Sequence, residues 1–389
     1  MTAGFSDLTL ESEPAPDKDD FTDMASSFPM VYHQQSSVAM GLDKSYVLHL
    51  AQCGDNLCSV SDTGALNLYT MDTLTKTHTL VPHTKAVTGL VSNPSKPDMV
   101  LTCSADQSVK VWDMRVSPHT AVHTLCYDTP HTADPPATPG KPLTCVGVNT
   151  AGLVAAGTEE VCGDTFLLFW DIRVGARQVG GYWDTHNDDI TTLQFHSDKP
   201  DILATGSTDG QVNVFNLAEQ DEDSALMSSI NTQDSVGRVL WYSNREQVMN
   251  LAIQTHTEGV QLWDTEQPSP GTVLHRGDVC QGMRRSVSDY TYIAGIHTVG
   301  GGVGVLGGSS YSPSPCIGLA EVRNKVIKPL ARLGTGGVVR CSVKYEGGFV
   351  TGGEDGVIRV WKEGTEEDRS KDSVGKTSNS KPSIRDKPY

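Results

Sequence analysis

The chain of 389 residues contains no apolar run long enough to cross a membrane. A membrane-spanning helix needs roughly 20 consecutive apolar residues, and no segment approaches that length. The acidic N-terminus also lacks the apolar core of a signal peptide. The match to Asn-x-Ser/Thr at Asn93-Pro94-Ser95 contains a proline, which blocks glycosylation. We therefore expect an intracellular protein, in the cytoplasm or the nucleus, with no membrane partner.

Paired cysteine motifs are also missing. The chain has nine cysteines at irregular spacing, and none of them forms a Cys-x-x-Cys pair. An odd number without a regular pattern argues against a disulfide framework. We expect reduced and mostly buried thiols, as is usual in a reducing compartment.

Positive charge is scarce. The chain has 30 Lys and Arg against 47 Asp and Glu, and its formal net charge is −17. Proteins bind nucleic acid largely by neutralising phosphates with Lys and Arg. The charge balance therefore disfavours direct binding to DNA or RNA, and it equally disfavours an anionic membrane surface.

The two ends of the chain have little apolar character. Residues 1–27 are acidic and rich in serine, and residues 363–389 carry mixed charges with Ser, Gly and Pro. Such segments cannot bury enough apolar surface to fold alone. We expect two disordered tails that flank one folded unit, residues 28–362.

Within that unit, six short apolar segments end in an aromatic residue at similar intervals. These aromatic anchors are Tyr69, Trp112, Trp170, Phe215, Trp263 and Trp361. They are spaced by 43, 58, 45, 48 and 98 residues, and the last interval is about twice the others. A period of roughly 40–50 residues made of β-type segments is typical of propeller blades.

Counting the segments predicts an all-β propeller with seven blades of four strands each. The sixth blade falls in the long interval, with strands expected between 290 and 330 and no aromatic anchor. The seventh blade lacks a fourth strand of its own. We expect Met30–His33 to supply it by pairing with Val357–Trp361, which would close the ring and remove exposed strand edges.

Three blades share a polar pattern in which a Thr lies four residues before an Asp and an aromatic residue lies six after it. The sets are His83, Thr102, Asp106 and Trp112; His186, Thr205, Asp209 and Phe215; and Thr351, Asp355 and Trp361, which has no His. This pattern resembles the structural tetrad of WD40 repeats. The resemblance implies that Asp bonds His, His bonds the Thr hydroxyl, and the hydroxyl bonds the Trp ring nitrogen.

A Thr, His and Asp set could also indicate a hydrolase. The set recurs at matched positions in separate blades, however, whereas a catalytic site occurs once. The chain also lacks a strained nucleophile turn of the Gly-x-Ser-x-Gly type. We therefore interpret the tetrads as structural and expect no enzyme activity. Phe215 cannot donate a hydrogen bond, so blade four should be held less well than blade two.

Two consecutive blades end in Trp-Asp-x-Arg, at Trp112-Asp113-Met114-Arg115 and at Trp170-Asp171-Ile172-Arg173. The motif is similar to the WD-x-R signature of substrate receptors for cullin-4 ubiquitin ligases. That resemblance implies that Arg115 and Arg173 face the ligase adaptor. The alternative is that each arginine pairs with a local carboxylate. Trp263-Asp264-Thr265-Glu266 has no arginine, so the feature is not a uniform part of the repeat.

Two further patterns suggest cofactor or metal sites but fit other structures better. Gly302–Gly307 matches G-x-G-x-x-G, yet serines and prolines follow it where a dinucleotide site requires a helix. His119, His123 and His131 lie in a proline-rich segment with no Cys or carboxylate that completes a metal set. We expect no cofactor and no metal.

Two insertions suggest that one face of the propeller docks onto an assembly and the other face selects a client protein. Residues 128–142 join blades two and three, and residues 157–165 join the second and third strands of blade three. Both connections belong on one face, opposite to Arg115 and Arg173. We expect a monomeric propeller that acts as a scaffold for other proteins, either as a cullin-4 substrate receptor or in another assembly such as ribosome-biogenesis or chromatin machinery.

The segments 157–160, 166–173 and 205–215 also resemble one scaffold member of the WD-repeat family more closely than the general repeat.

Overall fold

A computed structural model shows how the chain folds. It describes residues 28–41, 45–116, 120–127, 140–175, 177–219, 221–243, 249–267, 269–285, 290–310, 316–323, 325–334 and 337–364. Within these ranges, no helix has the length and apolar character needed to span a membrane. The expected tails and most of the insertion at 128–142 lie outside the described residues.

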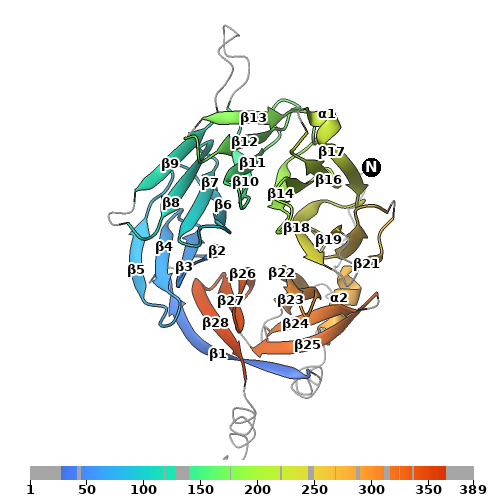
Figure 1. Ribbon diagram of the computed structural model, residues 1–389. Coiled ribbons are helices and arrows are strands. Elements are labelled where there is room, and N and C mark those ends of the chain that lie inside the picture. Colours follow the sequence, from blue (N-terminus) through green and yellow to red (C-terminus); the bar gives the residue numbers. More distant parts are fainter. Residues whose placement is uncertain are drawn as a thin grey trace, which may run out of the picture.

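The strands form seven four-stranded units arranged around an axis (Figure 1). In each of the first four blades, the strands follow one another outwards from the axis. Blade one comprises β2 (Val47–Cys53), β3 (Asn56–Ser61), β4 (Leu66–Thr70) and β5 (Lys76–Leu80). Blade two comprises β6 (Val87–Ser92), β7 (Met99–Ser104), β8 (Ser108–Asp113) and β9 (Ala121–Cys126). Blade three comprises β10 (Leu143–Val148), β11 (Leu153–Thr158), β12 (Leu167–Asp171) and β13 (Gln178–Tyr182). Blade four comprises β14 (Ile190–Phe195), β15 (Ile202–Ser207), β16 (Gln211–Asn216), α1 (Glu222–Ala225) and β17 (Leu226–Asn231).

The remaining blades follow the same order but vary more in length. Blade five comprises β18 (Val236–Ser243), β19 (Met249–Thr255), β20 (Val260–Asp264) and β21 (Thr272–Leu274), followed by α2 (Arg276–Gly282). Blade six comprises β22 (Thr291–Val299), β23 (Gly302–Ser309), β24 (Cys316–Arg323) and β25 (Val326–Gly334). Blade seven comprises β26 (Val339–Tyr345), β27 (Gly348–Gly353) and β28 (Val357–Glu363), with β1 (Met30–Ala39) as its fourth strand. The two short helices were not expected from the sequence.

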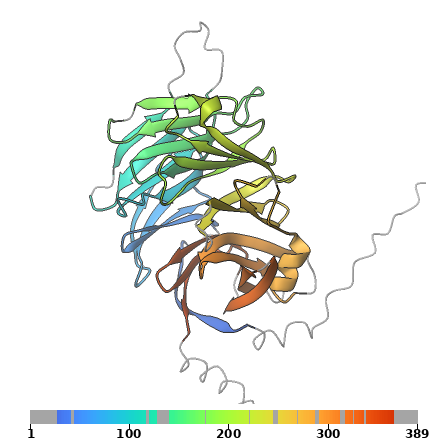
Figure 2. The same cartoon turned by 45° about the vertical axis from the view of Figure 1, so that its right-hand side comes forward.

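The N-terminal strand closes the ring, as predicted, but its register differs from the prediction. Residues Gln34–Ala39 pair with Val357–Trp361, whereas Met30 and Val31 pair in parallel with β25 of blade six. The prediction that Met30–His33 pairs with Val357–Trp361 was therefore wrong in register. The strand is ten residues long, so it can join two blades into one eight-stranded sheet. In this sheet β1 lies between β25 and β28, and Figure 2 shows the blue strand on the outer side of the ring.

The hydrophobic core is divided among the spaces between blades. Seven clusters of buried residues occur in the described part of the chain, and each cluster joins two adjacent blades. The cluster between blades seven and one contains Val47, Tyr69 and Val350, which have no accessible surface. Since a single blade leaves both apolar faces uncovered, stacking around a closed ring is what buries them.

The cysteines fit this core. All nine are free, and six of them are buried, in agreement with the expectation of reduced and mostly buried thiols.

Candidate functional site

The polar residues of blade two form a continuous hydrogen-bonded chain. His83 Nδ1 lies 3.0 Å from Asp106 Oδ2, and His83 Nε2 lies 2.8 Å from Thr102 Oγ1. The ring nitrogen of Trp112 donates to the same hydroxyl at 3.0 Å. Because Thr102 accepts from Trp112, its own proton is directed to His83 Nε2, which leaves Nδ1 to donate to Asp106. The chain ties β7, β8 and the segment before β6 together.

This network keeps its carboxylate charged and its imidazole neutral. Burial raises the pKa of Asp106, but hydrogen bonds from Ser108, from the Thr84 backbone and from His83 together hold that pKa below its ordinary value. Burial also lowers the pKa of His83, which outweighs the attraction of Asp106. Thr102 has no accessible surface. The set therefore has the arrangement of a structural link between strands, with no exposed hydroxyl to act as a nucleophile.

Blade four repeats the first half of the network. His186 Nδ1 lies 3.2 Å from Asp209 Oδ2, and His186 Nε2 lies 2.8 Å from Thr205 Oγ1. The position of Trp112 is taken by Phe215, which is 1% exposed and packs in the cluster between blades three and four. The network therefore ends at the Thr205 hydroxyl, one bond shorter than in blade two.

Blade seven keeps the second half of the network. Trp361 Nε1 donates to Thr351 Oγ1 at 2.9 Å. Asp355 has no histidine partner and instead binds the Arg359 guanidinium. This ion pair and nearby backbone donors hold the pKa of Asp355 below its ordinary value, against the effect of burial.

Two other aromatic anchors are held by partners that the sequence pattern did not indicate. Trp170 Nε1 donates to the backbone carbonyl of Cys126 in the preceding blade at 3.2 Å. Trp263 Nε1 donates to Gln261 Oε1 at 2.9 Å, and Gln261 in turn donates to the Thr232 carbonyl. A backbone acceptor and a glutamine two residues before the anchor have no recurring spacing, so periodicity could not reveal them.

The two Trp-Asp-x-Arg segments end in exposed turns on one face of blades two and three. Arg115 donates from Nε to Asp113 Oδ1 at 2.9 Å and from Nη2 to Asp113 Oδ2 at 2.7 Å. Arg173 makes the same paired contact with Asp171, at 3.0 Å and 2.6 Å. Both arginine side chains nevertheless remain about two-thirds exposed, at 67% and 65%. Each arginine thus pairs locally and still faces solvent.

The arginine is not needed to form these turns. Asp113 Oδ1 accepts the Arg115 backbone N–H, and Asp171 Oδ1 accepts that of Arg173. Asp264 makes the same contact with the backbone of Glu266 in blade five, where no arginine follows. The aspartate therefore closes the turn through the backbone, and the arginine side chain is an addition on the surface.

A groove lies beside the Arg115 turn. It has a volume of about 490 Å³ and is lined by the 95–99 segment, by Asp113, Arg115, Val122 and His123 of blade two, and by Ile172 of blade three. Ile172 directly precedes Arg173 in the chain. The groove therefore borders the Arg115 turn and reaches Ile172, the residue before Arg173, with apolar side chains along its wall.

The opposite face of blade three carries a loop held by a buried lysine. Lys141 is 3% exposed, and its Nζ donates to the carbonyl oxygens of Val161 and Asp164. The same ammonium lies 4.5 Å from the centre of the Phe166 ring. The backbone of Glu160 also donates to Asp189 of blade four at 2.7 Å. The insertion at 157–165 is therefore fixed in place, and Lys141 was not recognised in the sequence.

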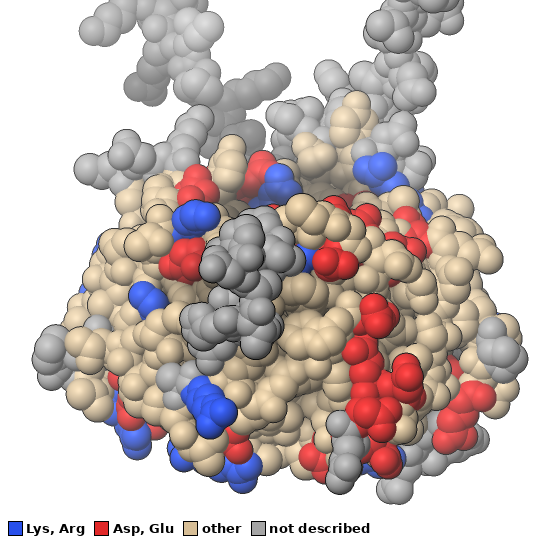
Figure 3. All heavy atoms as spheres, turned by 90° about the horizontal axis from the view of Figure 1, so that it is seen from above, with Lys and Arg blue, Asp and Glu red and all other residues tan. Residues whose placement is uncertain are grey.

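Aromatic and acidic groups lie along the neighbouring outer edge. Phe166 contacts Trp183 edge-on with ring centres 4.9 Å apart, and Trp183 is 46% exposed. Glu222 of α1 accepts from the backbone of Trp183 and Asp184. Figure 3, which looks onto this edge, shows a row of Asp and Glu side chains on its surface.

The structure also places the motifs considered for cofactors and metals. Gly302–Gly307 lies within strand β23, and the next element that the structure describes is strand β24. His123 lies in β9, while His119 and His131 lie outside the described residues. Across the described ranges, no group of three or more His, Cys, Asp or Glu side chains is placed to hold a metal ion.

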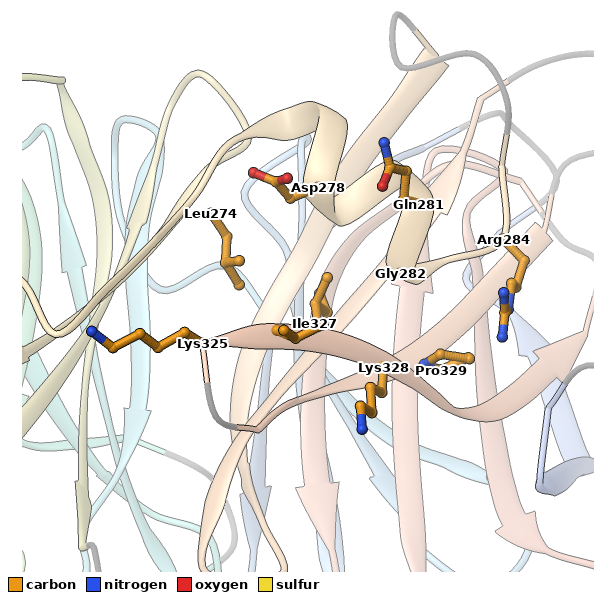
Figure 4. Close-up of a pocket in the computed structure, with 10 residues that line it drawn as sticks. Leu274, Asp278, Gln281, Gly282, Arg284, Lys325, Ile327, Lys328 and Pro329 are labelled. Carbon is orange, nitrogen blue, oxygen red and sulfur yellow. The ribbon is translucent and has the colours of Figure 1, made fainter.

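Another pocket, of about 630 Å³, lies between α2 and β25 (Figure 4). Leu274 and Ile327 supply apolar wall, and Asp278 lies on the helix side. Its ten lining residues include no His, Cys or Ser and a single carboxylate, so they form neither a nucleophile–base pair nor a metal set.

Comparison with known proteins agrees with this geometry. The family model described as "WD domain, G-beta repeat" matches residues 74–113, 178–216 and 327–362. These ranges contain the three sets of residues that form all or part of the Thr, Asp and aromatic pattern.

Several curated proteins are similar to this chain. An uncharacterized WD repeat-containing protein of Schizosaccharomyces pombe is 26% identical over 226 residues, which cover 57% of this chain and 63% of that protein. WD repeat-containing protein GTS1 of Arabidopsis thaliana is 27% identical over 294 residues, covering 69% and 67%. The WD repeat-containing protein 89 homolog of Dictyostelium discoideum is 24% identical over 236 residues, covering 60% and 58%.

The matched region thus spans less than two thirds of the length of two of these relatives. Residues 157–160, 166–173, 185–189 and 205–215 resemble WD repeat-containing protein 89, and the third relative is described as a homolog of that protein. The recurring tetrads, the seven blades and these matches agree, and they show that the chain carries WD40 repeats in a seven-bladed β-propeller.

Proposed function

We propose that this propeller is a non-enzymatic scaffold that docks onto a larger assembly through the face carrying Arg115 and Arg173. WD40 propellers generally serve as protein-interaction scaffolds. The observation that carries the proposal is the pair of outward-facing arginines on adjacent blades, with a groove that runs from Arg115 to Ile172, the residue before Arg173. A planar guanidinium offers several directed donors, and arginine is enriched where protein interfaces concentrate their binding energy.

The partner that best fits this surface is the adaptor subunit of cullin-4 ubiquitin ligases. The two turns match the WD-x-R signature in sequence and expose the arginine side chains at the end of the third strand of each blade. Each guanidinium is preoriented by its own aspartate, which lowers the entropy lost when a partner binds. In this proposal the protein acts as a substrate receptor, and the docked face leaves the opposite face open.

The opposite face of blades three and four would then select the client protein. The 157–165 loop is fixed by Lys141 and lies beside the exposed ring of Trp183 and the acidic α1. A fixed loop with an aromatic side chain and a carboxylate border suits a partner with basic residues. Replacing 128–142 and 157–165 with short turns should abolish client binding and spare docking.

Co-precipitation of the adaptor with the full-length protein tests the docking face. Wild type should recover the adaptor, and the double substitution Arg115→Ala/Arg173→Ala should reduce recovery at least tenfold. Arg323→Ala is a matched control, because Arg323 is also exposed and paired with a nearby carboxylate, Glu321, but lies in β24 of blade six. Equal recovery from wild type and the double variant would remove the support for this docking mode.

The competing proposal is a scaffold for a different intracellular assembly, such as ribosome-biogenesis or chromatin machinery. Both proposals use the same exposed turns, so identification of co-purified proteins separates them. Adaptor and ligase subunits lost on Arg115→Ala/Arg173→Ala would favour the receptor. Assembly factors recovered without any ligase subunit would favour the other scaffold.

A further inference from the structure

The innermost strands of the seven blades contain no acidic residue. These strands, β2, β6, β10, β14, β18, β22 and β26, surround the axis (Figure 1). The whole chain has 47 Asp and Glu, yet none lies in these seven strands. They contain instead Arg238, Arg340 and Lys344, together with His49 and His297. These seven strands therefore carry positive charge only, whereas the whole chain has a formal net charge of −17.

A register shift recurs in all seven innermost strands, and Arg238 occupies the shifted position in blade five. Every innermost strand shifts its pairing register near its start, as in a β-bulge. The residues that follow the shift form a ring of His49, Gly89, Cys145, Thr192, Arg238, Gly295 and Cys341. Arg238 is the only member of this ring with a permanent charge.

Other members of the ring bond the neighbouring blade. Cys145 Sγ lies 3.2 Å from the Ile190 carbonyl oxygen, and Cys341 Sγ lies 3.5 Å from that of Val47. These contacts satisfy local polar atoms and link consecutive blades.

Arg238 instead extends to blade six, next to Gly295. A Cβ atom built on Gly295 would lie 2.8 Å from Arg238 Nη1 and 2.7 Å from Ser342 Oγ of blade seven. The absent side chain at Gly295 therefore makes the space that the guanidinium occupies. The Ser342 hydroxyl is already engaged, because it lies 2.9 Å from His297 Nε2.

Arg238 also lacks a counter-charge. Among the residues that the structure describes, no carboxylate forms an ion pair with Arg238, and no group accepts a hydrogen bond from its side chain. By contrast, Arg115, Arg173, Arg340 and Arg359 each pair with a carboxylate. Arg238 is half-buried, so protein surrounds much of the side chain while solvent still reaches it.

Burial and the charge of Arg238 shift the pKa values of this part of the channel. Burial lowers the pKa of Arg238. Burial and then the charge of Arg238 lower the pKa of His49 to about 4 and that of His297 to about 3. Both imidazoles are therefore neutral at pH 7. A charged group in a partly desolvated position is unfavourable unless an opposite charge joins it.

We propose that the central channel binds a compact oxyanion, a phosphate or carboxylate group, at Arg238 between blades five, six and seven. The guanidinium fork matches the two oxygens of such a group and can donate two parallel hydrogen bonds. The oxyanion could be a free ion or a group carried on an extended partner segment, and both present the same chemistry to Arg238. This site is separate from the arginine turns and does not depend on the docking proposal.

Phosphate-dependent thermal stability of the full-length protein tests the site. Melting temperature is measured in increasing inorganic phosphate against chloride at matched ionic strength. Phosphate should raise the melting temperature of wild type in a saturable way, because a ligand that binds only the folded state stabilises it. Arg238→Gln should abolish this rise, and Arg323→Gln, which removes an exposed arginine of blade six, should retain it.

Stability in chloride alone separates binding from a structural role. Arg238→Gln removes an unpaired charge, so its melting temperature without phosphate should equal or exceed that of wild type. Gly295→Ala keeps the charge but places a methyl group where the guanidinium lies, and it should weaken the phosphate response at least tenfold in midpoint. An unchanged phosphate response in Arg238→Gln, or an equal loss in Arg323→Gln, would overturn the proposal.

A phosphoserine peptide and its unphosphorylated parent distinguish the source of the oxyanion. The midpoint is the ligand concentration that gives half of the rise in melting temperature. A midpoint at least tenfold lower for the phosphopeptide than for inorganic phosphate, with no rise in Arg238→Gln, would indicate a partner segment. Equal midpoints would indicate a free ion. If neither probe gives a response that depends on Arg238, the site does not exist.

Discussion

Blades two and six hold their four strands together by different interactions. Blade two has strands of six residues each and links them through His83, Thr102, Asp106 and Trp112. Among its described residues, blade six has no such network and no aromatic anchor, but its strands are nine, eight, eight and nine residues long. The sequence pattern made blade six look degenerate, yet it forms a longer backbone ladder than blade two.

The difference shows what a polar tetrad contributes. In blade two, one hydroxyl satisfies two buried groups, so short strands can be held with few backbone bonds. The strands of blade six are held together in another way. They are longer, they pack against helix α2, and β25 pairs in parallel with β1. Blade two should therefore be sensitive to single polar atoms, and blade six to packing and to the N-terminal strand.

The largest effect should come from removing the strand that closes the ring. Deleting residues 1–39 removes the partner of β28 and the contact with β25, which opens the sheet of blades six and seven. We expect a large loss in melting temperature or failure to fold. Deleting residues 1–27 is the control and should leave the melting temperature unchanged. An unchanged melt for the longer deletion would show that blade six holds without β1.

Next should come loss of apolar packing in blade six. Leu306 in β23 and Leu101 in β7 both have no accessible surface, and each packs in the cluster with the following blade. We expect Leu306→Ala and Leu101→Ala each to cost about 2–5 kcal/mol in the free energy of unfolding. Urea denaturation measures both. A cost for Leu306→Ala well below that for Leu101→Ala would contradict the view that blade six depends on packing.

The hydroxyl at the centre of the tetrad provides the matched test in blade two. Thr102→Val leaves both His83 Nε2 and Trp112 Nε1 without partners, and we expect a cost of about 2–4 kcal/mol. Thr205→Val leaves only His186 without a partner, and Thr351→Val leaves only Trp361 without one. Each should therefore cost about 1–3 kcal/mol in the free energy of unfolding. Equal costs for all three, measured by urea denaturation, would mean that the tetrad does not act as one network.

Acid should weaken the propeller through its neutral histidines. Burial lowers the pKa of His297 to about 3 from the ordinary 6.5, so the folded state binds a proton less readily than the unfolded state. Stability is therefore lost as pH falls below about 6.5, and the loss continues down to about pH 3. His297→Gln should reduce the difference in melting temperature between pH 7 and pH 5. The same difference in wild type and variant would exclude His297 as a source.

The smallest effect on stability should come from the arginine turns. Arg115→Ala and Arg173→Ala remove exposed ion pairs, while the aspartate still closes each turn through the backbone. Melting temperatures should match wild type within error. A clear loss would mean that reduced adaptor recovery reports on folding and not on docking.

Sequence alone determined the features that repeat. The aromatic anchors recur because each ends a third strand, and all six are buried between blades. That period predicted seven blades, and the Thr–Asp spacing predicted which residues meet in blades two and four. The arginines after Trp112 and Trp170 were visible for the same reason, although whether they bind a partner is still a prediction.

Only the tertiary structure decided the features that occur once. The register of β1 depends on two edges 26 residues apart in the sequence, at Ala331 and Val357, so no local pattern could specify it. Lys141 and Gln261 act through carbonyl groups that neither residue type nor spacing predicts. Arg238 looks like an ordinary strand residue until ring closure surrounds it with strands that carry no acidic side chain. Features that repeat in every blade show as periodicity in the sequence. The surroundings of Arg238 form only when blades that are far apart in the sequence close into a ring.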